Sequence, residues 1–201
     1  SWIGKEVDSS DIIHEILQDL IYYQKSGGGI TLSGGEPLQQ KDFALDILQK
    51  CREHRIHTAV ETNLLTDVNT LEAFLPWVDL WMCDFKMADD TLHRKWTGHS
   101  NVPIIKNLEF LAKQAVPLTI RTPVIPNVND SEEAIESICR FIRQLPNQPA
   151  YELLGFHSLG FVKFENLGMK NPLSNSAFLK KGQLQKLKEI LIRYNLNNNK
   201  K

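Results

Sequence analysis

Five short segments carry the residues whose types could bind a small molecule or take part in acid–base chemistry. They are Gly34-Gly35-Glu36, Glu61-Thr62-Asn63, Asp84-Phe85-Lys86, Arg121 and His157. Together they supply carboxylates, cations and uncovered backbone. Such a mixture suits a zwitterionic ligand, because an ammonium and a carboxylate each need a partner of opposite charge. The alternative is that these residues are polar only because strand ends meet solvent.

The glycine pair is the most informative of these segments. Adjacent glycines after an apolar run let the backbone approach a ligand without obstruction by a Cβ. Glu36 adds an acceptor, and Pro37 suits the first turn of a following helix. The segment lacks the Gly-Lys-Ser/Thr end of a Walker A loop and is not the dinucleotide-binding fingerprint. These residues therefore predict a ligand-binding turn of another kind.

Apolar periodicity predicts that strands and helices alternate along the whole chain. The five expected strands are 30–32, 56–60, 80–83, 118–120 and 151–154, and the six expected helices are centred on 12–20, 43–48, 71–78, 104–111, 135–142 and 184–191. The expected helix caps are Ser9 or Ser10, Asn101, and Asp130 with Glu133. Short apolar strands that alternate with helices indicate an α/β fold with a parallel sheet. Since ligands bind at the carboxyl ends of parallel strands, the five polar segments should converge on one mouth.

Composition narrows the class of protein. The 201 residues carry 23 Lys and Arg against 24 Asp and Glu, a formal net charge of −1, which does not suggest a nucleic-acid binder or a protein held on membranes by charge. No apolar run spans a bilayer, and residues 1–11 lack the apolar stretch of a signal peptide. The three cysteines are widely spaced, which favours a reducing compartment. We therefore expect one cytoplasmic domain over residues 1–201, with a disordered tail at 195–201.

Several segments, in the same order along the chain, resemble the radical S-adenosylmethionine enzymes. The likeness is to the activating enzymes of glycyl radical enzymes, the group that includes pyruvate formate-lyase activating enzyme. The segments are 26–38 (SGGGITLSGGEPL), 56–63 (IHTAVETN), 84–86 (DFK), 97–101 (TGHSN), 120–126 (IRTPVIP) and 152–160 (ELLGFHSLG). The resemblance implies a partial parallel (β/α)6 barrel. The first strand and its cluster-binding loop would be absent, because the chain opens on a helix and a crossover series normally begins with a strand.

The resemblance also implies roles for individual residues. Gly34, Gly35 and Glu36 would hold the methionyl amine of S-adenosylmethionine, and the other cofactor-binding positions would be Asn63, Asp84, Phe85, Lys86, Arg121 and His157. Glu61 and Asp84 would bind a monovalent cation near the cofactor carboxylate, although some family members have Asp at the position of Glu61. Two further departures from the family pattern are Leu64 and Asn127, which stand where glycine is common.

The family's [4Fe–4S] cluster is held by a Cys-x-x-x-Cys-x-x-Cys loop, and this sequence has no such spacing. Cys51, Cys83 and Cys139 lie in expected helices or a strand, so we do not expect them to replace it. The full enzyme would cleave S-adenosylmethionine reductively to a 5′-deoxyadenosyl radical, which would abstract a Cα hydrogen from a glycine of a partner glycyl radical enzyme. The partners implied are that enzyme and a flavodoxin or ferredoxin-type electron donor, and we expect this chain alone to be inactive.

Two other functions stay open from the sequence. The chain could be a cluster-free barrel that binds a ligand or a partner protein without radical chemistry. It could also be a cluster-free hydrolase or lyase that uses Glu36, Glu61 or Asp84 with His157 as acid and base, although no nucleophile elbow or metal-binding spacing supports this.

Overall fold

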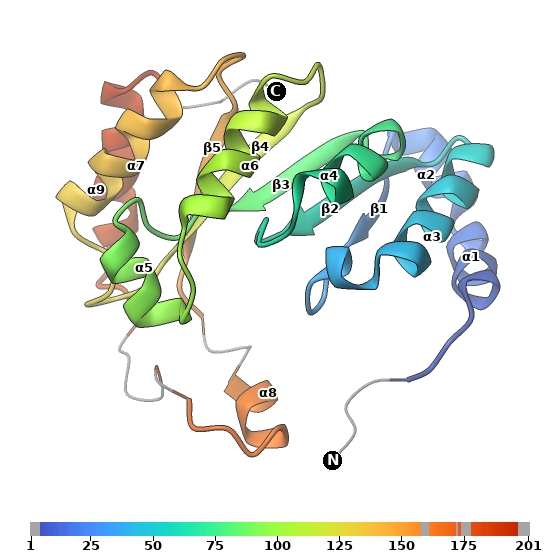
Figure 1. Cartoon of the computed structure of the whole chain (residues 1–201), viewed down its shortest axis with the longest axis horizontal. Helices are drawn as coiled ribbons and strands as arrows, with labels where there is room; N and C mark the ends of the chain where they lie inside the picture. Colours follow the sequence, from blue (N-terminus) through green and yellow to red (C-terminus); the bar gives the residue numbers. More distant parts are fainter. Residues whose placement is uncertain (1–4, 158–160, 172, 174–177, 197–201) are drawn as a thin grey trace.

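The computed structural model describes residues 5–157, 161–171, 173 and 178–196. Five parallel strands form one sheet: β1 (Gly29–Leu32), β2 (His57–Thr62), β3 (Leu80–Asp84), β4 (Leu118–Val124) and β5 (Ala150–Gly155). Their order in the sheet is their order along the chain, with β1 and β5 at the two edges (Figure 1). The expected α/β class, the five strands and their parallel arrangement are therefore confirmed, and the curved sheet is a partial barrel.

The helices are more numerous than the periodicity predicts. The described residues contain α1 (Ser9–Gln18), α2 (Leu20–Ser26), α3 (Lys41–Glu53), α4 (Val68–Phe74), α5 (Asp90–Thr97), α6 (Val102–Ala112), α7 (Glu132–Gln144), α8 (Phe161–Asn166) and α9 (Gln183–Arg193), with short 3₁₀ turns at Pro37–Gln40 and Leu75–Trp77. The expected first helix is two helices that meet at Asp19. Neither α5 nor α8 was expected; α5 is mostly polar, and only His93 in it is buried.

Two of the three expected helix caps are wrong by one or two residues, and the third, Asn101, is the N-cap residue as expected but does not cap through its side chain. Asp8 rather than Ser9 or Ser10 caps α1, by accepting the Ser10 N–H at 2.8 Å. Ser131 rather than Asp130 caps α7, by accepting the Ala134 N–H at 3.1 Å. Asn101 precedes α6 but makes no capping hydrogen bond, because its side chain is directed to the neighbouring loop. The corrections at α1 and α7 move the cap by one or two residues without changing the helix.

The strands present alternate side chains to two different environments. In β4 the side chains of Leu118, Ile120, Thr122 and Val124 are buried against the helices, whereas Thr119, Arg121 and Pro123 are half-buried on the other face. A β-strand directs successive side chains to opposite faces, so one face of the sheet builds the core and the other stays open. The core side includes Trp81, Phe85 and Leu108, all 0% exposed.

The two ends of the described chain differ in how they are held. A second apolar cluster of Ile13, Ile47, Cys51 and Ile56 joins α1 to α3 and the entry to β2. At the other end, Leu196 is 2% exposed and its N–H donates to the Leu191 carbonyl at 2.8 Å. The remainder of the tail expected to be disordered, residues 197–201, lies outside the described residues. Within the described part of the chain, no helix is both long and apolar enough to cross a bilayer.

Candidate functional site

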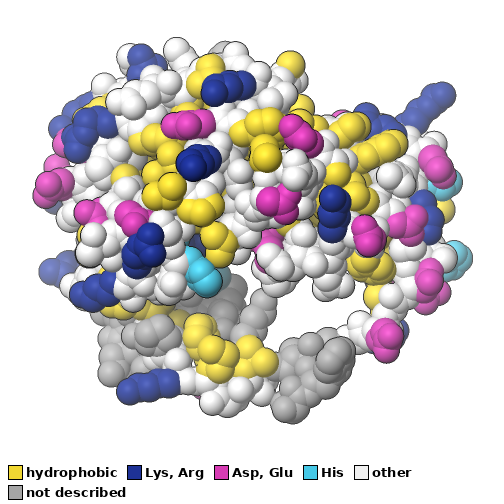
Figure 2. Space-filling view, viewed as in Figure 1, with side chains coloured by type: hydrophobic (Ala, Val, Ile, Leu, Met, Phe, Trp, Pro, Cys, Tyr) yellow, Lys and Arg dark blue, Asp and Glu magenta, His cyan; other side chains and the backbone are white. Residues whose placement is uncertain are grey.

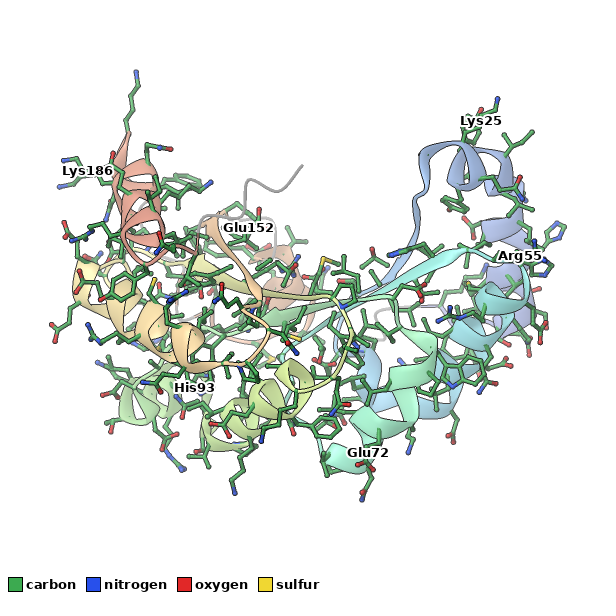
Figure 3. All side chains as sticks on the ribbon, turned by 90° about the horizontal axis from the view of Figure 1, so that it is seen from above. Lys25, Arg55, Glu72, His93, Glu152 and Lys186 are labelled. Atoms are coloured by element: carbon green, nitrogen blue, oxygen red, sulfur yellow. The ribbon has the colours of Figure 1, made fainter. Side chains whose placement is uncertain are left out.

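The open, concave face of the sheet carries the charged residues expected at the mouth. Glu61 and Asp84 stand at half-buried positions at the carboxyl ends of β2 and β3, and Arg121 lies beside Asp84 in the middle of β4, which runs on to Val124 rather than ending at residue 120 as expected. Figure 3 shows Glu152 of β5 on this concave side, whereas Glu72 and His93 lie with the helices on the convex side. The parallel register therefore gathers charges from four neighbouring strands on one surface.

The turn after β1 leaves open space where side chains would stand. Gly34 has φ +109°, a conformation that non-glycine residues rarely adopt. A Cβ built on Gly34 or on Gly35 would meet no atom within 4 Å. The two glycines thus expose backbone at the carboxyl end of β1, as their position in the sequence predicts.

Glu36 is largely engaged within the protein. Its Oε1 accepts the Thr62 hydroxyl at 2.7 Å and the Leu38 N–H at 3.2 Å, and its Oε2 accepts the Asn63 N–H at 2.8 Å. A carboxylate offers about four acceptor positions, so about one remains for a ligand. Glu36 therefore fixes the turn after β1 to the end of β2, and only one position is left for an ammonium.

Asn63 and Leu64 shape the turn after β2. The side-chain oxygen of Asn63 accepts the Leu65 N–H at 2.8 Å. Leu64 has φ +57° and is fully buried. Glycine suits this position because it adopts the left-handed backbone conformation without strain. Leucine is retained here because the burial of its apolar side chain offsets that strain. Asn127, the other departure, has φ +61°, which asparagine tolerates better than most residues.

A network of four charged side chains covers the ends of β2 and β3 and the middle of β4. Arg121 Nη2 forms an ion pair with Glu61 Oε1 and lies 3.5 Å from Asp84 Oδ1. Lys86 Nζ lies 3.1 Å from Asp84 Oδ2. The Arg121 side chain is 12% exposed, so the network is partly shielded from water. The structure thus brings Glu61, Asp84, Lys86 and Arg121 together, as the sequence predicts.

Phe85 and His157 differ from the other candidates. The Phe85 side chain is fully buried, and its ring centroid lies 5.1 Å from that of Phe141, in the core. Its N–H donates to Arg121 O at 2.9 Å, and its carbonyl accepts the Thr122 hydroxyl at 2.6 Å. Phe85 therefore stands outside the open surface and anchors the residues on either side of it. His157 is exposed two residues after the end of β5.

Three buried asparagines, which sequence reasoning did not single out for this role, hold the loops around the mouth. The Nδ2 group of Asn107 donates to the carbonyls of Leu64 and Thr66 at 2.9 and 2.8 Å. In the same way, Asn101 donates to the carbonyls of Met87 and Ala88. Asn129 donates to the carbonyls of Lys86 and Pro123. The sequence offers a signal for Asn107 alone, an asparagine among the apolar residues of α6, since a buried amide needs partners.

The three cysteines are buried and unsuited to bind a cluster. Burial raises the pKa of the Cys51 thiol to about 11 and that of Cys139 to about 12. Burial, with the nearby Asp84 charge, raises the pKa of Cys83 well above its ordinary value. The thiolate is the form that binds iron. Among the described residues no group of three or more His, Cys, Asp or Glu side chains is arranged to hold a metal ion.

An apolar surface lies beside the mouth. α8 stands apart from the sheet, on the side of the strands' carboxyl ends (Figure 1). Figure 2 shows hydrophobic side chains gathered over it. The exposed apolar residues include Val162 in α8 and Leu167, Met169 and Phe178 in the chain that follows it. The Phe156 ring lies between those of Phe161 and Phe178, at centroid distances of 5.9 and 6.4 Å.

Comparisons with known proteins agree with this fold. Residues 4–141 match the radical SAM superfamily. The chain is 40% identical over 172 residues to the isethionate sulfite-lyase activating enzyme of Desulfovibrio desulfuricans, covering 85% of this chain and 55% of that protein. It is 34% identical over 188 residues to the pyruvate formate-lyase-activating enzyme of Clostridium pasteurianum, covering 94% of this chain and 79% of that protein. The chain thus spans about half the length of the first of these relatives.

Solved structures give the same result. A domain of pyruvate-formate lyase-activating enzyme from Bacteroides vulgatus superposes with a TM-score of 0.71 at 31% identity, covering 84% of this chain and 96% of that one. Streptococcus suis SuiB bound to its precursor peptide SuiA superposes with a TM-score of 0.70 at 17% identity, a likeness of fold alone. On the family match and the two activating-enzyme relatives, the chain belongs to the radical SAM superfamily and, within it, to the activating enzymes of glycyl radical enzymes.

Proposed function

We propose that the protein to which this chain belongs activates a glycyl radical enzyme by removing a hydrogen atom from the Cα of a glycine in that partner. The observation that carries the proposal is the uncovered Gly34-Gly35 turn, which opens beside the charged network of Glu61, Asp84, Lys86 and Arg121. A zwitterionic cofactor needs such a pairing of uncovered backbone with charges of both signs. S-adenosylmethionine is the ligand of this kind that the family uses.

The residues present fit the methionyl end of S-adenosylmethionine. The space beside Gly34 and Gly35 is one that a Cβ would fill, and Glu36 keeps about one acceptor position for the ammonium. Arg121 and Lys86 supply positive charge for the carboxylate. Asn63 and His157 flank this surface from the ends of β2 and β5. When bound and reduced, S-adenosylmethionine supplies the 5′-deoxyadenosyl radical; this chain's own residues bind and orient it.

The residues present do not fit the [4Fe–4S] cluster. The thiols of Cys51, Cys83 and Cys139 are buried in three separate elements and are held protonated. None of the three cysteines of this sequence is therefore suited to hold the cluster, and we assign none of them to electron transfer. The expectation of a flavodoxin or ferredoxin-type electron donor rests on the family alone.

The surface beside the mouth supports a protein partner rather than a small substrate. Val162, Leu167 and Met169 are each more than half exposed, and an exposed apolar patch of this kind typically marks a protein contact. A glycine is a sensible target because a partner backbone without a side chain can enter a narrow mouth. Which glycyl radical enzyme is the partner would be set in part by this surface.

The two alternatives receive different support. A cluster-free barrel that binds a ligand or a partner protein without radical chemistry stays an alternative, and cluster cysteines elsewhere in the whole protein would rule it out. The hydrolase or lyase reading is disfavoured, because Glu36 is engaged by three donors and Glu61 and Asp84 are paired with Arg121. Each of these carboxylates is held in its charged form by donors of the protein, an arrangement that suits ligand binding better than proton transfer.

Equilibrium dialysis with radiolabelled S-adenosylmethionine tests the cofactor site directly. We expect saturable binding to the chain and its loss in Gly35→Val. Gly35 does not have a positive φ, so the variant should fold while its side chain fills the open space. Gln144→Val, on the exposed last turn of α7, is the control and should bind as the parent does. Equal binding by both variants, or no saturable binding at all, would contradict the proposed site.

A further inference from the structure

We propose that the guanidinium of Arg121 stands in the place of the monovalent cation expected between Glu61 and Asp84, so that this chain holds the cofactor carboxylate without a metal ion. The inference rests on the proposed function, since it concerns how the same site would bind S-adenosylmethionine. It starts from the finding that the two carboxylates expected to bind a cation are both already within reach of one guanidinium.

The ion pair between Arg121 and Glu61 crosses a strand. Arg121 lies beside Asp84 in the pairing of β3 with β4, whereas Glu61 lies beside Met82 in the pairing of β2 with β3. The guanidinium therefore passes over β3, and its Nη1 lies 3.8 Å from the Met82 sulfur. From this position its Nη2 contacts Glu61 on one side and Asp84 on the other. The place between the two carboxylates is filled by a side chain of the protein.

The charges of the network already balance. Glu61 and Asp84 contribute two negative charges, and Arg121 and Lys86 contribute two positive charges, so these four side chains sum to zero. Glu152, beside Arg121 in the pairing of β4 with β5, adds one negative charge on the same face. A metal ion placed there would face the guanidinium at short range, and like charges repel strongly where water is partly excluded. Arg121 Nε is buried and has no acceptor among the described residues, which leaves a donor that a ligand carboxylate would satisfy and a cation would not.

The length of the Glu61 side chain explains the arrangement. Glutamate carries its carboxylate one methylene farther from the backbone than aspartate, and here it reaches across β3 to a residue of β4. An aspartate at position 61 would end one carbon short of this contact. The Glu61→Asp change should therefore release Arg121 and open the place between the two carboxylates to a metal ion.

Sodium-23 NMR of the whole chain tests cation binding without the cofactor. We expect no saturable broadening of the sodium line by the parent protein, and saturable broadening by Arg121→Met and by Glu61→Asp. Arg52→Met is the matched control, since it breaks the ion pair of Arg52 with Asp79, at 3.1 Å, near the opposite end of β3. It should leave the sodium line as in the parent. Saturable broadening by the parent itself would overturn the inference, as would the lack of broadening by a folded Glu61→Asp variant.

A second measurement separates failure of this inference from failure of the proposed function. The dissociation constant of S-adenosylmethionine, measured at equal ionic strength in potassium, sodium and choline chloride, should agree within about twofold for the parent. Glu61→Asp should bind on the order of tenfold more weakly in choline than in potassium or sodium, because cation and cofactor would then be linked. Binding by the parent that requires potassium or sodium would overturn the inference and leave the proposed function intact. If the parent binds S-adenosylmethionine in none of the three salts, the proposed cofactor site is refuted. The sodium-23 NMR measurement would then decide the inference by itself.

Discussion

The carboxylate of Glu36 accepts the backbone N–H of Asn63 at 2.8 Å, so the turn after β1 is tied to the turn after β2. The same carboxylate accepts the Thr62 hydroxyl and the Leu38 N–H. An acid at this position therefore has a structural role before any ligand is present. Two neighbouring loops of the candidate site are positioned by one side chain.

Glu36→Gln should lower both stability and affinity for S-adenosylmethionine. In the glutamine variant an NH₂ group replaces one of the two carboxylate oxygens and faces an N–H or O–H group that the carboxylate now accepts from. One hydrogen bond is then lost and its donor is left unpaired, which should lower the free energy of unfolding by about 1–3 kcal/mol. Urea unfolding and equilibrium dialysis measure the two effects. Glu109→Gln, exposed on α6, is the control and should change neither. An unaltered stability of Glu36→Gln would show that the three hydrogen bonds to Glu36 do not hold the turn.

Asn107→Leu should destabilise the chain by about 2–3 kcal/mol, because the Leu64 and Thr66 carbonyls would lose their shared buried donor. The loss should also raise the mobility of the turn after β2, which amide hydrogen exchange at Leu65 would report. Asn69→Ala, at an exposed position of α4, should leave both quantities close to the parent values. Equal unfolding midpoints for the two variants would rule out this role for Asn107.

Gly29→Ala should be among the most harmful single changes in the sheet. A Cβ at this position would lie 1.7 Å from the His57 carbonyl oxygen, so β1 and β2 could not keep their present pairing. We expect a loss of about 3 kcal/mol in the free energy of unfolding. Gly28→Ala is the neighbouring control, since its Cβ would meet only the Ser26 hydroxyl, at 3.0 Å, which can rotate away. Comparable thermal midpoints for the two variants would contradict the strand pairing.

The three cysteines should be unreactive in the folded protein and should not assemble a cluster. Burial and raised pKa values keep the thiols of Cys51, Cys83 and Cys139 protonated at neutral pH. A chromogenic disulfide reagent should titrate none of them quickly in buffer and all three in urea.

Anaerobic incubation with iron and sulfide should leave no cluster bound to the chain. With S-adenosylmethionine and a reductant added, the chain should form no 5′-deoxyadenosine. Formation of that product would show that the chain alone is active.

Asp90 should contribute stability that depends on pH. The Ser100 hydroxyl, then Arg94 and the Asn101 N–H, stabilise the charged form and lower the pKa of this carboxyl to about 2. A lowered pKa gives stability that is fully present above the unfolded value near 3.8 and is lost as the pH falls through about 2. Asp90→Asn should therefore lower the urea midpoint at pH 7 and have a smaller effect at pH 2. A difference from the parent that does not shrink on acidification would contradict this linkage.

The sequence predicts the strands and the mouth well because both depend on local patterns. Apolar runs that end in polar residues mark β2, β3 and β4, and the parallel register brings Glu61, Asp84 and Arg121 to one surface. Distances between strands are not encoded locally. Two contacts depend on the curvature of the sheet: the hydrogen bond from the Asn63 N–H to Glu36 and the ion pair of Arg121, across Met82, with Glu61. No spacing in the sequence predicts either of them.

Two further gaps have plain physical causes. α5 escaped prediction because its stability comes from caps and polar contacts rather than from an apolar stripe; Asp89 accepts the Leu92 N–H at 2.7 Å, and Gly98 ends the helix with φ +79°. The resemblance groups Phe85 with Asp84 and Lys86 as cofactor-binding residues. The alternation of charged, apolar and charged residues instead indicates that its side chain points to the opposite face, and its burial in the core agrees with that alternation.

The strands lie in the sheet in the same order as along the chain, and this affects how the protein folds. Each new strand pairs with the one synthesised just before it, so the sheet can grow from one edge and no strand has to insert between two that are already paired. The longest step between paired strands is the one from β3 to β4, which includes α5 and α6. The entropy cost of closing a loop grows with the length of chain in it, so this step should be the slowest addition. The side-chain amide of Asn101 donates to the Met87 and Ala88 carbonyls and so ties the start of α6 to the loop after β3. This contact shortens the loop that remains to be closed and would speed the step.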